Sequence, residues 1–425
     1  MTFAPIRSRG HDAGQASDSV RSVRRHRTGF WLIAFAFATA MAFSTVPTPL
    51  YSIYQTRDGF STFAVTVVFA AYAIGVLTSL LLAGHVSDSV GRKRVLIAAL
   101  ALELGSAVLF LTVLSFPGLV VARVISGLGV GLMTATATAH LQELHAAHRP
   151  GASTERFAIV STAANIGGIG LGSLVSGVLA QFVASPLRVP YLVFVALLLV
   201  AVAAVTLTPE TVEARFARPA YRPQRLGTGQ QGLASYLAAV GGGFASFAVL
   251  GLFTSVAPGF VAGTLHHHSH ALAGLVTFAV FGASALAQML TGRLTARVRT
   301  FAGLVVPAIG IAVVTISLDA PSFALFLIGG IAAGAGAGVL FKSSIGAVAA
   351  ASLPAKRGEA LAGLFLVSYL GLALPIVGIG VATRYLATTT VMAWFAVAFV
   401  ALLAVVGVLT TRPHTADIRT ERTKS

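Results

Sequence analysis

Two ionisable residues lie deep inside hydrophobic segments of this 425-residue chain. Glu103 lies near the middle of the apolar run 94–115, and Arg123 lies in the next run, 118–142. A carboxyl group held away from water can gain and lose a proton as its access to water changes, so Glu103 is a candidate proton-coupling residue. Arg123 is a candidate for supporting a polar cavity. Two alternatives stay open: an ion pair or hydroxyl hydrogen bond that makes Glu103 structural, and an Arg123 side chain that reaches the membrane surface.

The remaining polar residues within or beside the apolar runs favour no catalytic chemistry. We expect the ammonium group of Lys342 to reach the nearby interface. The tract His266–His270 has a metal-binding composition, as has the set His140, Glu143, His145 and His148. We favour solvated side chains for both sets. The chain has no cysteine and no GxxxxGK[ST] phosphate-binding loop, so we expect no metal, no cofactor, no ATP-driven step and no enzymatic activity.

The elements that position Glu103 and Arg123 must be membrane helices. Hydrophobic residues make up 56% of the chain and charged residues only 10%. A soluble domain carries about 25% charged residues, so this chain lacks the charge to cover a water-facing surface. Crossing a hydrocarbon core takes about 20 apolar residues, and a helix satisfies its own backbone hydrogen bonds in lipid. We therefore predict an all-α membrane protein with twelve spans at about 29–54, 62–83, 94–115, 118–142, 156–183, 189–208, 233–262, 271–290, 301–318, 321–348, 359–383 and 387–410.

The net charge of +16 follows the predicted loops. With the N-terminus inside, 24 of the 29 Lys and Arg residues fall on the cytoplasmic side, whereas Arg57, Arg188 and Arg384 fall outside. Cytoplasmic loops of membrane proteins carry such an excess. We therefore predict a multi-pass protein of the bacterial inner (plasma) membrane with both termini in the cytoplasm. We attribute the positive charge to this topology and to contact with anionic lipid, and we expect no nucleic-acid partner and a monomer.

The chain divides into two similar halves. The proline-rich segment 209–232 reads as a cytoplasmic linker between six-helix bundles at 29–208 and 233–410, with polar tails at 1–28 and 411–425 that we expect to be disordered. Glu155 and Glu359 open the fifth and eleventh runs 204 residues apart, and Gly167 and Gly371 share that offset. At an offset of 207, the glycines of the fourth run match those of the tenth: Gly127, Gly129 and Gly131 with Gly334, Gly336 and Gly338.

Similar halves in parallel orientation imply a pseudo-two-fold axis along the membrane normal. Such an axis places a substrate site near the midplane, between the halves. The alternative is that glycine-rich membrane helices resemble one another by chance.

The segment between the second and third runs reads Gly84-His85-Val86-Ser87-Asp88-Ser89-Val90-Gly91-Arg92-Lys93-Arg94. It resembles the G-x-x-x-D-x-x-G-R-[KR] signature of the major facilitator superfamily. We expect Gly84 to permit close helix approach, Gly91 a tight turn, and Asp88 to pair with Arg92 or to face a helix N-terminus. The resemblance implies a gating loop (Gly84, Asp88, Gly91, Arg92 and Lys93) that joins the cytoplasmic ends of the halves when the cavity faces outward. The equivalent stretch, 292–300, has Ala296 and Arg299 at the Asp and second Gly positions, so we expect a one-sided contact.

Two further glycine patterns are similar to patterns of this superfamily. Arg123, Gly127, Gly129 and Gly131 follow its R-x-x-x-G-x-G spacing. In the fifth run, Gly168, Gly172 and Gly177 resemble the antiporter signature G-x-x-x-G-P-x-x-G-G, but Ser173 and Ser176 depart from it; the repeat partner carries Pro375. Small residues at this spacing let helices approach closely, and generic packing is the alternative. The resemblance implies an exporter, and the two departures keep uptake open.

The resemblance over about residues 29–410 implies a secondary transporter that works by alternating access. We expect proton-coupled efflux of a small, largely apolar compound, with proton-linked uptake of a metabolite as the alternative; a transporter-derived receptor or scaffold and a membrane-embedded enzyme are the hypotheses from other classes. Because the spans hold few acids, we expect neutral or weakly anionic substrates rather than dications. We expect an aromatic cavity lining from Phe35, Phe37, Phe43, Tyr51, Tyr54, Phe244 and Phe247.

Overall fold

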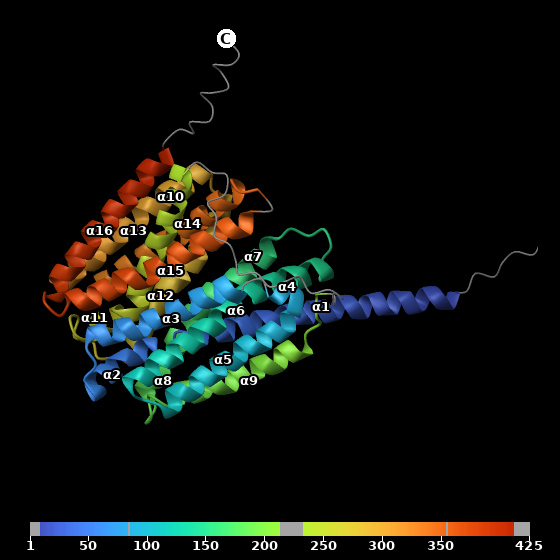
Figure 1. Cartoon of the computed structure of the whole chain (residues 1–425), viewed down its shortest axis with the longest axis horizontal. Helices are drawn as coiled ribbons and strands as arrows, with labels where there is room; N and C mark the ends of the chain where they lie inside the picture. Colours follow the sequence, from blue (N-terminus) through green and yellow to red (C-terminus); the bar gives the residue numbers. More distant parts are fainter. Residues whose placement is uncertain (1–8, 84–85, 213–232, 354–355, 412–425) are drawn as a thin grey trace, which may run out of the picture.

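The computed structural model describes residues 9–83, 86–212, 233–353 and 356–411, and every regular element in these ranges is a helix (Figure 1). Twelve of its helical segments are long and apolar enough to cross a membrane, which confirms the predicted all-α architecture. The first half contains α1 (Arg9–Phe43), η1 (Thr48–Leu50), α2 (Tyr51–Asp58), α3 (Thr62–Ala83), α4 (Ser87–Val90), α5 (Arg92–Thr112), α6 (Phe116–His148), α7 (Glu155–Thr162), the π-helix η2 (Ala163–Gly167), α8 (Gly168–Phe182) and α9 (Val189–Leu207). The second half contains α10 (Leu233–Ser255), α11 (Ala257–Ala262), α12 (His270–Leu290), η3 (Thr291–Arg293), α13 (Ala296–Asp319), α14 (Phe323–Ala350), α15 (Arg357–Ala382) and α16 (Thr388–Thr411).

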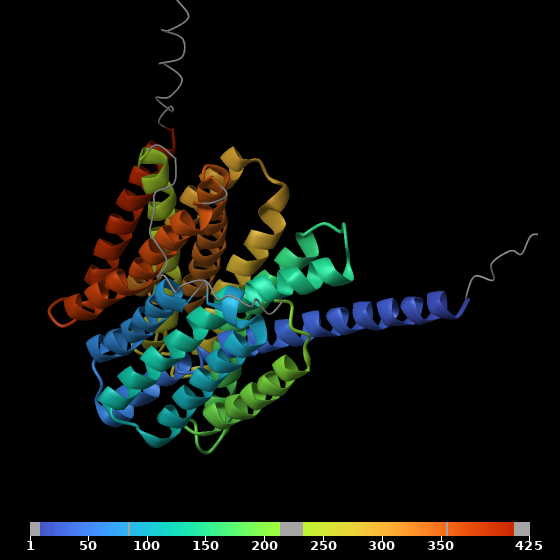
Figure 2. The same ribbon diagram turned by 45° about the vertical axis from the view of Figure 1, so that its right-hand side comes forward.

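The first span differs from its predicted form at both ends. Helix α1 begins at Arg9, inside the tail that we expected to be disordered, and it projects from the bundle in Figures 1 and 2. The reason is that a helix already nucleated in the membrane span adds further residues without a new nucleation step, each forming one more backbone hydrogen bond. At its other end the span breaks after Phe43, because Pro47 and Pro49 lack the N–H groups that a continuous helix needs. The segments 1–8 and 412–425 lie outside the described residues.

The two halves form separate six-span bundles that pack along one seam. Helix α8 packs against α12, and α3 packs against α15. We call the end of the molecule that carries α4 and α7 the basic end, because it carries Arg92, Lys93 and Arg94; the opposite end carries α2 and α11. The bundles diverge toward the basic end in Figures 1 and 2. There an apolar cleft of about 630 Å³ lies between α3 and α15, lined by residues that include Leu81 and Leu361.

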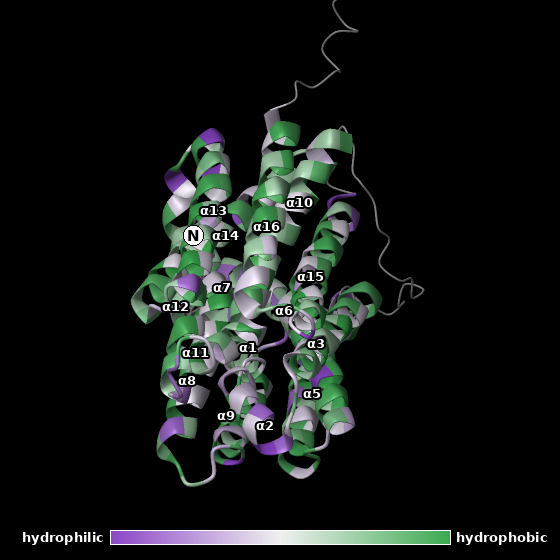
Figure 3. Cartoon of the chain, turned by 90° about the vertical axis from the view of Figure 1, so that its left-hand side faces the viewer, coloured by the Kyte–Doolittle hydropathy of each residue, from purple (hydrophilic) through white to green (hydrophobic). Residues whose placement is uncertain are grey.

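The outer surface of both bundles is apolar. Hydrophobic residues run along the lengths of the helices in Figure 3. Large side chains such as Phe301 and Trp394, each 67% exposed, point outward. A water-soluble protein rarely exposes apolar surface on this scale, whereas a lipid bilayer covers it.

The glycine patterns of the two halves occupy equivalent places in space. In α6, Gly127 and Gly131 face α3, and Gly129 faces α5. The same order recurs in α14, in which two glycines face α12 and the one between them faces α13: Gly334, Gly338 and Gly336. At each position an added Cβ would meet neighbouring atoms at 3.0 Å or less, so these crossings depend on glycine. The sequence repeat is therefore also a structural repeat.

The alignment of Gly167 with Gly371 is wrong by one residue. A Cβ on Gly168 would lie 2.8 Å from the Ala38 carbonyl oxygen of α1, as one on Gly371 would meet the Phe244 carbonyl oxygen of α10. Nothing lies within 4 Å of a Cβ on Gly167. The physical reason is η2, because a π-helical turn inserts one extra residue before Gly168 and shifts the register of the rest of the helix.

Candidate functional site

A cavity of about 860 Å³, measured with its open space, lies between the two halves. Its walls come from α1, α3, α6 and the η2–α8 segment of the first half, and from α10, α12, α14 and α15 of the second. A position between the two halves is the one that the sequence repeat predicts. Its lining in the described part of the chain includes no Asp, Glu, Lys, Arg or His.

The aromatic residues of the cavity differ from those that we expected. Of the seven residues proposed from the sequence, Phe247 alone is found in the described lining. Phe37 and Phe43 are buried in the core of the first half, and Phe35 is partly exposed on α1. The observed aromatic lining is Phe69, Tyr72, Phe247, Phe281, Phe341, Phe365 and Tyr369. The sequence missed all of these except Phe247, because helices that are apolar on every side carry little signal of which face turns inward.

Glu103 lies outside the cavity, fully buried between α5 and α6. The Ser126 hydroxyl donates a hydrogen bond to its Oε2 at 3.0 Å. Its Oε1 has no hydrogen-bond partner among the described residues, and a Cβ on Gly129 would lie 3.0 Å from that oxygen. Among the residues that the structure describes, no ion pair joins Glu103 to Arg123. The structure thus brings Glu103 to a hydroxyl and to a glycine, not to the arginine.

Arg123 is 1% exposed and therefore does not reach the membrane surface. Its Nη1 donates to the Ser44 carbonyl oxygen at 2.6 Å, and its Nε donates to the Tyr51 hydroxyl at 3.0 Å. The guanidinium also lies 5.6 and 5.5 Å from the ring centroids of Tyr51 and Tyr72. Ser44 directly follows the end of α1, where helix carbonyl groups lose their partners. Arg123 therefore joins the broken first span to α6, beside Ser44 and Tyr72, which line the cavity.

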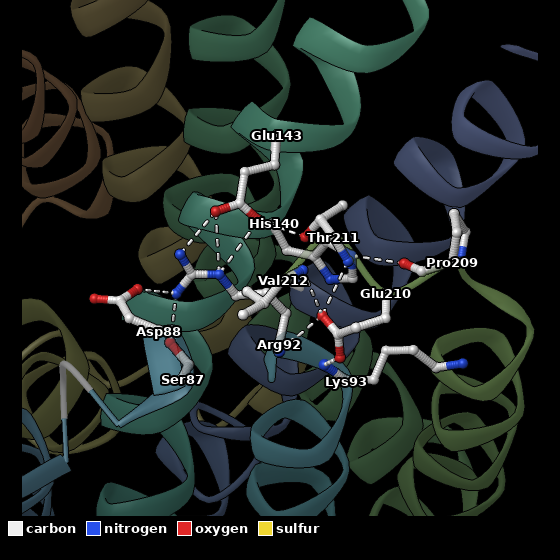
Figure 4. Close-up of polar contacts among 10 residues, drawn as sticks. All are labelled: Ser87, Asp88, Arg92, Lys93, His140, Glu143, Pro209, Glu210, Thr211 and Val212. Carbon is white, nitrogen blue, oxygen red and sulfur yellow. Dashed lines mark hydrogen bonds and ion pairs between the residues drawn. The ribbon is translucent and has the colours of Figure 1, made fainter. Parts of the chain in front are cut away.

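The gating loop forms a polar cluster at the basic end (Figure 4). Arg92 pairs with Asp88 at 2.5 Å, as expected, and with Glu143 at the end of α6 at 2.7 Å. Its Nη1 also donates to the Ser87 hydroxyl. Lys93 donates to the Thr206 carbonyl oxygen at the end of α9. Gly84 lies outside the described residues.

Glu210, which sequence reasoning did not single out, completes this cluster. Its carboxylate accepts hydrogen bonds from the backbone N–H groups of Arg92 at 3.0 Å and Lys93 at 3.1 Å, the first turn of α5 (Figure 4). Gly91 has φ +107°, and a Cβ on it would lie 2.9 Å from Glu210 Oε2. Glycine at this position therefore permits both the turn before α5 and the close approach of the Glu210 carboxylate. The available signal was an acidic residue directly after the sixth span.

The protonation of Glu210 is shifted by this site. Burial acts to raise the pKa of Glu210, but hydrogen bonds from the backbone N–H groups of Val212, Lys93, Arg92 and Thr211 hold that pKa below its usual value. The carboxylate is therefore charged at neutral pH, when it faces the positive end of the α5 dipole.

The contacts of the gating loop described here all lie within the first half. Arg92 and Lys93 join the start of α5 to the ends of α6 and α9. The side chain of Asp88 is 64% exposed at the basic end. In the second half, Arg299 donates to the carbonyl oxygens of Gly292 and Leu294, at the equivalent place.

The set His140, Glu143, His145 and His148, which has a metal-binding composition, has other partners. Glu143 binds Arg92, and the ring nitrogens of His140, His145 and His148 lie within hydrogen-bond distance of backbone carbonyl oxygens. In the described ranges, no group of three His, Cys, Asp or Glu residues is placed to hold a metal ion. Lys342 donates to the Gln288 carbonyl oxygen near the end of α12.

The glycines of the fifth span join three helices. Gly168 and Gly172 face the carbonyl oxygens of Ala38 and Ala42 in α1, and Gly177 faces α12 of the other half. Pro375 lies inside α15, 203 residues after Gly172. The pattern therefore serves both packing within the first half and the seam between halves.

The seam at the opposite end contains specific polar contacts. The Ser52 hydroxyl and His270 Nδ1 lie 3.3 Å apart, and the His270 backbone N–H donates to Gln181 at 2.9 Å. The Arg384 guanidinium lies 4.0 Å from the ring centroid of Phe63, which belongs to the other half. These contacts join the halves at the opposite end, where a recess of about 1170 Å³ also lies between them, and a cleft separates α3 from α15 at the basic end.

Comparison with known proteins matches one family. Residues 30–236 match the family model described as Major Facilitator Superfamily, a stretch that begins inside α1, covers the rest of the first half and ends in the first turn of α10. No curated protein matches the chain.

Proposed function

The chain belongs to the Major Facilitator Superfamily of secondary transporters, and we propose that it exports a small, largely apolar compound by proton-coupled alternating access. The observation that carries this proposal is the cavity between the two halves. Its lining comes from both bundles, which are in contact beside a recess of about 1170 Å³ at the opposite end and are separated by a cleft at the basic end. Rocking of one bundle against the other exposes such a site to each side in turn.

We propose that the basic end is cytoplasmic, so that both termini lie in the cytoplasm of a bacterial cell and this state faces inward. The asymmetric distribution of Lys and Arg supports that orientation. In the outward-facing state, the basic ends of the halves must approach each other. The exposed carboxylate of Asp88 is available to a second-half partner there, which agrees with the gating role that the family resemblance implies.

Glu103 is our candidate for the proton-coupling residue. It is a fully buried carboxyl group with one unpartnered oxygen in the described structure, and it lies where α5 and α6 touch at Gly129. Because a charged and a neutral carboxyl group differ greatly in the cost of burial, proton binding at Glu103 changes the free energy of this helix contact. Its place behind the cavity implies an indirect coupling, through helix packing rather than through competition with substrate.

Proton-linked uptake remains the second candidate function. The observation that favours it is the pair Ser173 and Ser176, which replaces two defining residues of the antiporter signature. Everted membrane vesicles separate the two functions, since substrate added to energised vesicles releases luminal protons only for an antiporter.

Paired cysteines test alternating access directly, because the natural chain contains no cysteine. The pair Ser52→Cys and His270→Cys reports contact at the opposite end, and the pair Leu81→Cys and Leu361→Cys reports closure at the basic end. Oxidative cross-linking of each pair, with a covalent label for unreacted thiols, measures the fraction of molecules closed at the opposite end and the fraction closed at the basic end. We expect each pair to cross-link in a different fraction of molecules. A basic-end pair that never cross-links under any gradient contradicts the proposal.

A further inference from the structure

The central cavity has two chemically different walls. One is an aromatic wall of the second half, formed by Phe247 of α10, Phe341 of α14, and Phe365 and Tyr369 of α15. The ring centroid of Phe247 lies 4.9 Å from that of Phe341 and 5.2 Å from that of Tyr369, and Phe341 lies 6.0 Å from Phe365. Clustered rings of this kind favour a planar aromatic guest by stacking and edge contacts.

The other wall carries hydrogen-bonding groups on α12 and η2. Phe281, Ser284 and Gln288 recur every three or four residues along α12, so they form one stripe of that helix. Ser284 is fully buried, lines the cavity, and its hydroxyl has no hydrogen-bond partner in the described structure. An unsatisfied buried hydroxyl is unfavourable, so a ligand group that bonds to it is stabilised there.

Asn165 adds a second amide to the cavity lining, besides that of Gln288. It lies in the π-helix η2, which contacts α12, and Gly170, slightly further along, faces Phe281 of α12. Both amide side chains line the cavity, and neither makes a side-chain hydrogen bond to another described residue. Lys342 bonds the backbone oxygen of Gln288 and leaves its amide free. A primary amide offers a donor and an acceptor side by side.

Charged ligands find no counterion in this lining. The charged groups closest to the lining already have other positions or partners: Arg123 is bound to Ser44 and Tyr51, Lys342 is bound to the backbone oxygen of Gln288, and Glu103 lies beyond the cavity wall. Desolvating an ion without a partner costs far more than desolvating a neutral polar group.

From these walls, and resting on the proposed transport function, we infer that the cavity selects uncharged, planar aromatic compounds with an adjacent hydrogen-bond donor and acceptor on one edge. The rings lie against Phe247 and its neighbours, and the polar edge faces Asn165, Ser284 and Gln288.

Equilibrium binding to the full chain in lipid nanodiscs tests the inference with three probes of matched shape. Tritiated 2-quinolinone is neutral and has an adjacent N–H and C=O, N-methyl-2-quinolinone lacks the donor, and N-methylquinolinium is a permanent cation. We expect saturable binding of 2-quinolinone, competition roughly 2- to 10-fold weaker by the N-methyl lactam, and none by the cation at equal concentration.

Variants locate the probe in the cavity. Asn165→Leu, Gln288→Leu and Phe247→Leu should each weaken 2-quinolinone binding roughly 2- to 10-fold. Phe301→Leu, on the outer surface, is the matched control and should leave binding unchanged. Gln288→Glu places a carboxylate in the lining and should make N-methylquinolinium an effective competitor, a gain that misfolding cannot produce.

Three results would overturn the inference: equal competition by the cation in the natural chain, unchanged binding in both amide variants, or no saturable 2-quinolinone binding. The two cysteine-pair variants are prepared in the same lipid nanodiscs, and their cross-linking is measured with and without 2-quinolinone. Alternating cross-links without 2-quinolinone binding reject the ligand class and leave the transport function standing, whereas absent alternation rejects the transport function itself.

Discussion

Gly177 and Gly380, which are 203 residues apart, occupy equivalent positions in the two repeats, and each contacts the other half at the same end of the molecule. A Cβ on Gly177 would meet the His270 carbonyl oxygen and the Gly274 backbone of α12. A Cβ on Gly380 would meet the Thr66 side chain of α3. At the opposite end, the seam therefore contains two equivalent close contacts, one from each repeat.

The first prediction concerns this seam. Gly177→Leu and Gly380→Leu should each hold the halves apart at the opposite end, because no space exists there for a side chain. We expect less cross-linking of the Ser52–His270 cysteine pair, more of the Leu81–Leu361 pair, and at least a tenfold loss of transport. Gly378→Leu, on the same helix but with nothing within 4 Å of its Cβ, is the control. Normal cross-linking in both seam variants would show that the glycines do not set the contact.

The second prediction concerns the cap of α5. Glu210→Ala removes the acceptor of the Arg92 and Lys93 N–H groups and should lower the free energy of unfolding by about 1 kcal/mol. Thermal unfolding in detergent, followed by circular dichroism, measures the loss. Glu155→Ala, at an exposed helix start, should have a smaller effect. Equal losses of stability in the two variants would show that the hydrogen bonds from Arg92 and Lys93 to Glu210 do not stabilise the start of α5.

The third prediction is the pH dependence of that cap. Because the folded-state pKa of Glu210 is lowered, its contribution is fully present above the unfolded pKa of about 4.3 and is lost as the pH falls through the lower folded value. The stability difference between the natural chain and Glu210→Ala should therefore be constant from pH 6 to 8 and shrink below about pH 4. If this stability difference grew on acidification, the pKa of Glu210 would be raised by folding rather than lowered.

The fourth prediction concerns Arg123. Arg123→Leu leaves the Ser44 carbonyl oxygen and the Tyr51 hydroxyl without their donor and should destabilise the protein by roughly 2 kcal/mol. Arg123→Lys keeps the charge but loses the forked geometry, so we expect an intermediate loss. Arg188→Leu, an exposed arginine at the opposite end, is the control. If all three variants unfold at the same temperature as the natural chain, the bonds of Arg123 contribute nothing to stability.

The fifth prediction tests Glu103 in everted vesicles. Glu103→Gln keeps an acceptor for Ser126 but cannot titrate, so it should retain substrate binding and lose substrate-driven proton release. Binding of 2-quinolinone and the elution profile of the purified variant control for folding. Full proton release by Glu103→Gln would remove Glu103 from the coupling mechanism.

Local sequence determined the architecture of this protein. Each span needs about 20 contiguous apolar residues, so length and composition reveal all twelve without any knowledge of their neighbours. The pairing of Asp88 with Arg92 was also predictable, because the two residues are four apart in a short segment. The repeat was visible for the same reason, although the extra residue of η2 moved one glycine match from Gly167 to Gly168.

Only the tertiary structure decided which side chains meet. Glu143 and Glu210 reach Arg92 from 51 and 118 residues away, and no local pattern encodes such a distance. The cavity lining also depends on tertiary structure, because a helix that is hydrophobic on every side gives no periodic signal of its rotation. The lining therefore contains Phe341 and Tyr369 rather than the expected Phe37 and Tyr51. For the same reason the sequence did not decide that Glu103 contacts Ser126 rather than Arg123. Helix packing fixed these rotations, through glycine contacts between segments distant in sequence.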